Sequence, residues 1–187
     1  MSMQTFLPSP DYIVSAQLID KVRLNKQITE CYQLLNANLA DGGWQHHPAA
    51  KMWRGYEGSL VCYAKACFHE FVKRGGSKTH KSWHKIQNQY GGLRDVRLPW
   101  LGHEEFHSSH RSRLLHKGNL DIIAKSLPRK PEKFLKQYFE SSCQIAVREL
   151  TVAQSADLWR YLDCKGDNWY NQFGWAERPS DNYIWPI

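Results

Sequence analysis

The segment RLNKQITECYQLL, residues 23–35, decides how the rest of the chain is arranged. At helical spacing its apolar residues share one face and its polar residues share another. The apolar face holds Leu24, Ile28, Cys31 and Leu35, and the polar face holds Arg23, Lys26, Gln27, Glu30 and Gln33. We therefore predict an amphipathic helix whose apolar side packs against the protein and whose polar side points outward.

Glu30 is a single carboxylate within a row of basic and amide side chains. Beside a polyanion, such a row places cations on the phosphates and leaves the acid to transfer protons or to stabilise a developing positive charge. A solvated amphipathic helix has the same pattern, and helical spacing alone favours that structural interpretation. Glu30 is the first candidate for chemistry, with both interpretations open at this point.

Length and composition indicate one globular domain. A chain of 187 residues with 42% hydrophobic residues can bury a sizeable core, and it is too short to form two domains of ordinary size. The five cysteines are odd in number and three lie in apolar helical patterns, which indicates reduced thiols. No apolar run has the length of a membrane span and no signal-peptide pattern is present, so we expect a cytoplasmic protein without a membrane partner.

The excess of positive charge is concentrated in one window. The chain has a net charge of +7, and residues 73–117 hold ten Lys/Arg against three Asp/Glu, a difference equal to that whole charge. Aromatic residues alternate with these cations. This combination favours a nucleic acid over an acidic protein or a membrane surface, with a merely soluble basic surface as the alternative.

Apolar spacing and helix-stop residues predict helices along the chain. Ser9 as N-cap and Pro10 as the first helical position predict a helix starting near Asp11, with a break near residues 20–23. The central helix is expected to stop at residues 41–43, Asp-Gly-Gly.

The longest predicted helix spans about residues 49–74. Gly55 and Gly58 within it indicate that another backbone packs closely there. Lys73 and Arg74, followed by Gly75-Gly76, are typical of a helix C-terminus, because cations favour the negative end of the dipole and glycine adopts the left-handed cap.

Residues 77–102 are expected to be irregular. Helices are then expected over about 103–117, 120–127, 132–147 and 152–164, followed by an aromatic tail over 167–187 that packs on the body or offers stacking surfaces. The first of these helices aligns His103, His107 and His110. We predict no metal site, because no Cys or Asp completes a ligand set and neighbouring cations repel a metal; phosphate contact, or capping and solvation, is expected instead.

Several motifs, taken in order, resemble the pyrimidine-dimer DNA glycosylases of the phage endonuclease V type. Leu24 and Glu30 keep the six-residue spacing between a leucine and the catalytic glutamate of the phage enzyme. GYEGSLVCYAKACFHEFVKRGG, residues 55–76, resembles its central helix, and PWLGHEEFHSSHRSRLL, residues 99–115, resembles its third helix. The chain resembles a bacterial and phage branch of the family more closely, through the motifs MQTFLP, LIDKVRLNKQ, HPAAKMWRGYE, FHSSHRSRLL and YIWP.

The resemblance implies a fold and a reaction. It implies a compact, all-α helical bundle of the endonuclease V type, with residues 1–187 as a single domain. In the resembled branch, HRSRLL leads almost directly to the aromatic tail, so residues 119–166 are expected to be a helical insertion. The implied activity is that of a DNA N-glycosylase with associated AP lyase: an amine attacks C1′ of a damaged or modified pyrimidine nucleotide, the base leaves, and the Schiff base permits β-elimination.

The resemblance also assigns roles to residues. Glu30 matches the catalytic glutamate, and no cofactor is implied. The amine is an N-terminal α-amino group, which would belong to Ser2 once Met1 is removed, and Lys26 is the alternative amine. Two phosphate-gripping arginines of the phage enzyme correspond to Thr29 and Gln33 here, and we expect Arg23 and Lys26 to take over their contact.

We expect the partner to be duplex DNA with a damaged or modified base, bound by a monomer that is nucleoid-associated or encoded by a phage in the host cytoplasm. Trp53 and two aromatic residues of the tail are candidates to fill the gap left by a flipped base. The alternatives are an enzyme that acts on hypermodified phage bases, a non-catalytic DNA-binding module and an RNA-binding protein. The predicted DNA contacts are Arg23, Lys26, Gln27, Arg54, His107, His110, Arg111, Arg113, Trp169 and Tyr170.

Overall fold

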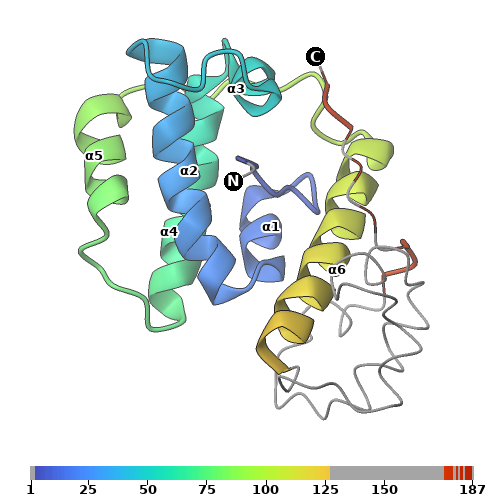
Figure 1. Cartoon of the computed structure of the whole chain (residues 1–187). Helices are drawn as coiled ribbons and strands as arrows, with labels where there is room; N and C mark the ends of the chain where they lie inside the picture. The colour runs from blue at the N-terminus through green and yellow to red at the C-terminus, as the bar shows by residue number, and fades with distance from the viewer. Residues whose placement is uncertain (1–2, 127–174, 179, 181, 183, 187) are drawn as a thin grey trace, which may run out of the picture. The chain divides into compact units, whose positions relative to one another are not determined.

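Helices make up the regular secondary structure of the described part of the chain (Figure 1). The computed structural model describes residues 3–126, 175–178, 180, 182 and 184–186. Within these residues the predicted all-α fold class is confirmed, and no helix is long and apolar enough to cross a membrane. The helices are α1 (Tyr12–Leu18), α2 (Lys21–Leu39), α3 (Pro48–Trp53), α4 (Glu57–Lys73), α5 (Lys81–Tyr90) and α6 (Glu104–Ser126).

The chain divides into two compact units. Unit 1 comprises Met1–His107 with Ile184–Ile187, and unit 2 comprises Ser108–Tyr183, so the boundary falls inside α6. The predicted insertion, residues 119–166, begins within α6, and its remainder lies outside the described residues. The insertion and the single domain over residues 1–187 stay predictions.

Helices α2 and α4 form the centre of unit 1. α2 packs against α3, α4 and α5, and α4 also packs against α1 and α5. In the view of Figure 1, α5 and α1 lie on opposite sides of the α2–α4 pair. The predicted apolar face of α2 is confirmed, because its four residues are completely buried: Leu24, Ile28, Cys31 and Leu35. Burial of a leucine or isoleucine side chain stabilises the fold by about 1.5–3 kcal/mol.

The start of α1 differs from the prediction. α1 begins at Tyr12, because the carboxylate of Asp11, and not the hydroxyl of Ser9, caps it. Oδ1 of Asp11 accepts hydrogen bonds from the backbone N–H groups of Ile13 and Val14, at 2.7 and 2.9 Å. A carboxylate at the N-cap is favoured by the partial positive charge of the helix terminus as well as by these bonds.

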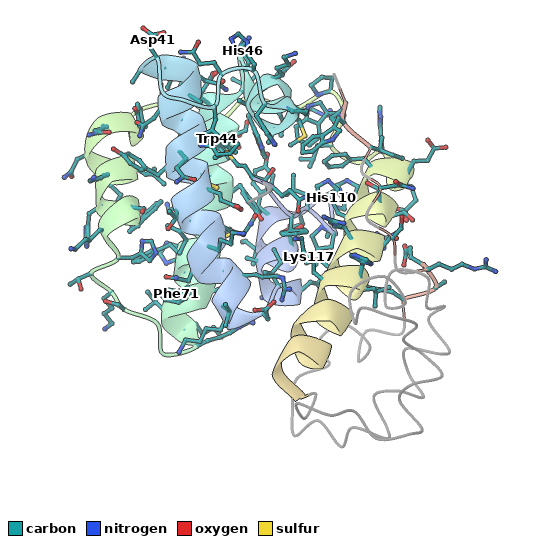
Figure 2. The ribbon with its side chains drawn as sticks, viewed as in Figure 1. Asp41, Trp44, His46, Phe71, His110 and Lys117 are labelled. Atoms are coloured by element: carbon teal, nitrogen blue, oxygen red, sulfur yellow. The ribbon has the colours of Figure 1, made fainter. Side chains whose placement is uncertain are left out.

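The ends of α2 follow the prediction. The expected break between the first two helices occurs at Ile19 and Asp20, and Asp20 caps α2 by accepting from the backbone N–H of Arg23 at 2.9 Å. α2 ends at Leu39, and Asp41 then adopts the left-handed region with φ 52°. Figure 2 shows Asp41 and His46 in the turns that follow this end of α2.

The predicted long helix over residues 49–74 is in fact two helices. α3 ends at Trp53 and α4 begins at Glu57, and the chain turns between them at Gly55, whose φ of +84° is available to glycine and strained for other residues. At the other end the prediction is confirmed, because α4 stops at Lys73 and Gly75 has a φ of +76°. Gly55 is therefore a turn residue and not a site of close packing.

Helix α5 was not predicted, because residues 77–102 are rich in lysine and arginine and only Trp83 and Ile86 of this helix are buried. The indole of Trp83 stacks on the ring of Phe68 in α4, with ring centroids 5.0 Å apart. α6 is longer than predicted, because Gly118 does not stop it and the helix continues to Ser126. A single glycine costs a helix only about 1 kcal/mol, which the rest of a long helix can offset.

Gly58 lets a loop backbone pack directly on α4. A Cβ atom at Gly58 would lie 1.7 Å from the carbonyl oxygen of Arg94. Next to it, the buried hydroxyl of Ser59 contacts the Asp95 carboxylate at 2.6 Å and accepts from the backbone N–H of Val96 at 3.1 Å. The close approach predicted for Gly58 is confirmed, and it fixes the loop that follows α5.

We predict that Gly58→Ala destabilises the protein by about 2–3 kcal/mol, because the added methyl group meets backbone and not a flexible side chain. The gain in helix propensity, about 1 kcal/mol, is too small to offset this cost. The free energy of unfolding in urea measures the effect. Gly43→Ala is the matched control, since a Cβ there has no atom within 4 Å. Equal stability of the two variants would contradict the packing described.

Candidate active site around Glu30

Glu30 lies in the middle of α2, and only 5% of it is exposed. The Nε2 group of Gln27 donates a hydrogen bond to Oε2 of Glu30 at 2.8 Å, and the ammonium of Lys26 lies 3.6 Å from Oε1. Burial of a carboxylate costs free energy unless hydrogen bonds or a cation compensate it. The predicted outward position of Glu30 is therefore wrong: the carboxylate is enclosed, with a donor and a cation beside it.

Gln27 was predicted to contact DNA, and its position argues against that role because the residue is completely buried. Its Nε2 group donates both to Glu30 and to the backbone oxygen of Gln4, each at 2.8 Å. Its Oε1 atom accepts from the backbone N–H of Phe6 at 2.8 Å. One side-chain amide thus connects the Glu30 carboxylate to the N-terminal arm, which we define as residues 3–7.

The N-terminal arm is buried along its whole length, including its polar residues Gln4 and Thr5. The hydroxyl of Tyr63 in α4 lies 2.6 Å from the backbone oxygen of Phe6 and 2.9 Å from Oε1 of Gln27, and it can donate its proton to either. The indole Nε1 of Trp53 donates to the hydroxyl of Thr5 at 2.9 Å. Side chains from α2, α3 and α4 therefore hold the arm against the core.

Trp53 was a candidate to fill the gap left by a flipped base. It is completely buried, its ring stacks on Tyr63 at a centroid distance of 6.2 Å, and its N–H group is occupied by the arm. This position is incompatible with insertion into DNA. Trp53 is a core residue.

Three buried side chains of α2 and α4, Cys31, Tyr63 and Cys67, remain in their protonated forms. Burial raises the pKa of Tyr63 well above its ordinary value, and burial likewise raises that of Cys31. Burial raises the pKa of Cys67 to about 12. Tyr63 is therefore a hydrogen-bond donor at neutral pH, and the two thiols are poor nucleophiles because the thiolate is the reactive form.

Two predicted phosphate contacts, Arg23 and Lys26, precede Glu30 on α2. Lys26 is exposed, so its ammonium can reach a ligand while staying near the carboxylate. Arg23 is half-buried, and its guanidinium donates to the Asp20 carboxylate at 2.7 Å. Arg54 is exposed after α3, and it donates to the backbone oxygen of Gln45 at 2.8 Å.

His107 was also a predicted phosphate contact, and its position argues against that role. It is completely buried in unit 1, with Nδ1 2.7 Å from the backbone oxygen of Leu7 and Nε2 accepting from the N–H of Gly102 at 2.9 Å. These two bonds require the neutral imidazole with its proton on Nδ1. His107 therefore fixes the end of the N-terminal arm.

The remaining described candidates, His110, Arg111 and Arg113, belong to unit 2. Arg111 forms an ion pair with Glu177 at 2.6 Å, and the hydroxyl of Ser112 donates to the backbone oxygen of Arg178, so part of the C-terminal tail lies along α6 within this unit. Ser2, Trp169 and Tyr170 lie outside the described residues. Among the described residues, no three His, Cys, Asp or Glu side chains are grouped to hold a metal ion.

The sequence analysis did not identify Gln4 and Tyr63, whose contacts complete the network around Gln27. Two signals were available. Gln4 and Thr5 are polar residues in an otherwise apolar arm, and Gln27 precedes Glu30 by three residues, so both side chains lie on one face of a helix.

One family model matches part of the chain. Residues 3–85 match the model of a family described as pyrimidine dimer DNA glycosylase. The comparisons with curated proteins and with solved structures give no match. The matched range contains the N-terminal arm, Gln27, Glu30 and Tyr63, and it ends within α5. This match supports the predicted family: over residues 3–85 the chain is similar to the pyrimidine dimer DNA glycosylases.

Proposed function

We propose that the protein is a DNA glycosylase with associated AP lyase activity, which excises a damaged or modified pyrimidine from duplex DNA with Glu30 as its acid–base residue. The observation that supports this most is the amide of Gln27, which binds the Glu30 carboxylate and the N-terminal arm at the same time. The family match covers this network and describes the same class of reaction.

The nucleophile in this proposal is the α-amino group of Ser2, exposed by removal of Met1. Ser2 precedes Gln4 by two residues, and two residues of chain span at most about 7 Å. The shared donor between the backbone oxygen of Gln4 and the Glu30 carboxylate supports this proposal, which requires the amine to reach the carboxylate. An α-amino group has a pKa of about 8, so an appreciable fraction is unprotonated at neutral pH. The ammonium of Lys26, 3.6 Å from Glu30, is the alternative amine.

The reaction proceeds by covalent catalysis. The amine nitrogen forms a bond to C1′, the glycosidic bond breaks, and the base leaves with the bonding electrons and takes up a proton. The sugar ring then opens as O4′ is protonated, which gives a Schiff base at C1′. Loss of a proton from C2′ expels the 3′ phosphate, and water hydrolyses the Schiff base to return the amine. Glu30 transfers the protons at O4′ and C2′ and stabilises the cationic sugar.

Cations around this centre bind the DNA backbone. Lys26 and Arg54 are exposed in unit 1, and Arg23 lies at the start of α2. Arg111 and Arg113 are proposed to add contacts from unit 2, with Trp169 and Tyr170 as stacking residues, whereas the complete burial of His110 argues against its predicted phosphate contact. Substrate binding should weaken as salt rises, because bound phosphates release counterions.

We predict that Glu30→Gln lowers the single-turnover rate of base excision by at least about 10²-fold, because the amide cannot transfer protons. The amide oxygen can still accept from Gln27, so the melting temperature should stay close to that of the wild type. Glu105→Gln, which removes an exposed carboxylate from α6, is the charge-matched control and should excise at the wild-type rate. An active Glu30→Gln enzyme would refute the assigned role. Duplexes containing a pyrimidine dimer and duplexes containing hypermodified bases, assayed in parallel, identify the substrate.

Borohydride reduction identifies the attacking amine. We predict that reduction during turnover on an abasic duplex links the protein to DNA, and that mass spectrometry places the link on the α-nitrogen of residue 2. Lys26→Arg should still be trapped. A link on Lys26 that disappears in this variant would transfer the nucleophilic role to Lys26, and the absence of any link would contradict covalent catalysis.

Gln27→Leu removes the donor to Glu30 and the anchor of the N-terminal arm. We predict a kcat lowered by about 10–100-fold with KM changed much less, since a displaced acid and amine affect the chemical step more than the phosphate contacts. The control is Gln17→Leu, which changes an exposed glutamine of α1. If kcat is unchanged, or if only KM changes, Gln27 does not position the catalytic groups.

A further inference from the structure

We propose that α5 and its flanking loops form a second site for the DNA backbone, separate from the Glu30 site, which binds the duplex beside the lesion; this inference rests on the proposed function. We name it the α5 cationic surface. It consists of exposed residues of unit 1: Lys78, Lys81, Lys85, Arg94 and Arg97.

The α5 cationic surface has a large excess of positive charge. Across residues 71–97 the only acid is Asp95, which offsets one positive charge and accepts from the hydroxyl of Ser59 at 2.6 Å. None of the five cations has an ion pair with another described residue. By contrast, Arg23, Arg74 and Arg111 in the same structure are each held by a carboxylate at 2.7 Å or less. A group of exposed, unpaired cations is the electrostatic pattern of a polyanion-binding face.

The surface is also rigidly held. Tyr90 donates to the Asn36 side chain at 2.6 Å, His80 contacts the Asn25 side chain at 3.1 Å, and the ammonium of Lys85 lies 5.2 Å above the ring of Tyr32. These contacts fix both ends and the middle of α5 to α2. The contact of Gly58 with the Arg94 carbonyl fixes the loop that carries the two arginines. Ordered cations lose less side-chain and backbone entropy when they bind phosphate.

The α5 cationic surface packs on a different face of α2 from the one that carries Glu30. We expect one bound duplex to reach both. Asn25, Tyr32 and Asn36 face α5, whereas Gln27 and Glu30 face the N-terminal arm. The exposed Lys26 follows Asn25 and connects the two faces. Packed helices lie about 8–10 Å apart, which corresponds to about three base pairs of duplex. A duplex bound at Glu30 can therefore reach α5 with its flanking phosphates.

The test is the salt dependence of binding to an undamaged duplex of about two helical turns. Each lost phosphate contact lowers the slope of log K against log salt by about 0.9, so we expect the double variant Lys81→Gln/Lys85→Gln to lower it by about 2. Lys78→Gln/Arg97→Gln should do the same without altering the Tyr32 contact. The control Lys51→Gln/Lys65→Gln removes two exposed cations of α3 and α4, and therefore the same charge, with little effect on the slope.

Equal slopes of log K against log salt in all three double variants would contradict the proposal that the α5 cationic surface binds DNA. Single-turnover excision at saturating protein separates this result from the proposed function. The α5 variants should excise at the wild-type rate once DNA is bound, whereas Glu30→Gln should not. If Glu30→Gln is inactive and the salt slopes are equal, the proposal of a second DNA site is contradicted and the glycosylase proposal is still supported.

Discussion

The amide of Gln27 is the interaction on which the rest of unit 1 depends. It binds a carboxylate from its own helix and two backbone groups of the N-terminal arm, and Tyr63 from α4 lies against its oxygen. A buried amide that uses its donors and acceptors in this way is stable only when all partners are present. The arm therefore completes the core, and the backbone oxygen of its Gln4 shares the Gln27 donor with Glu30.

This constraint explains why polar residues occupy the interior. Thr5 and Gln27 are buried although neither is apolar, and the side chain of each has a hydrogen bond that links the arm to a helix. A hydrophobic arm would bury more apolar area, yet it would not orient a carboxylate. The polar network holds the Glu30 carboxylate against the N-terminal arm, and the proposed reaction requires an acid that is held in a fixed position in this way.

Much of the fold was predictable because local signals decide it. The apolar stripe of α2 and the glycine cap of α4 each follow from a few neighbouring residues. α5 and the division into α3 and α4 depend on tertiary contacts, such as the stacking of Trp83 on Phe68. The site follows the same rule. Spacing identified Glu30, whereas the burial of Gln27 depends on an arm more than twenty residues away, which helical spacing cannot reveal.

The central claim is that the start of the chain and the Glu30 carboxylate act on the same sugar. The most direct measurement is a crystal structure of the borohydride-reduced complex with an abasic duplex. The account predicts a covalent bond from the α-nitrogen of residue 2 to C1′, with the Glu30 carboxylate within hydrogen-bond distance of the opened sugar and Gln27 still bound to Gln4. A sugar linked elsewhere, with Glu30 facing only protein, would contradict it.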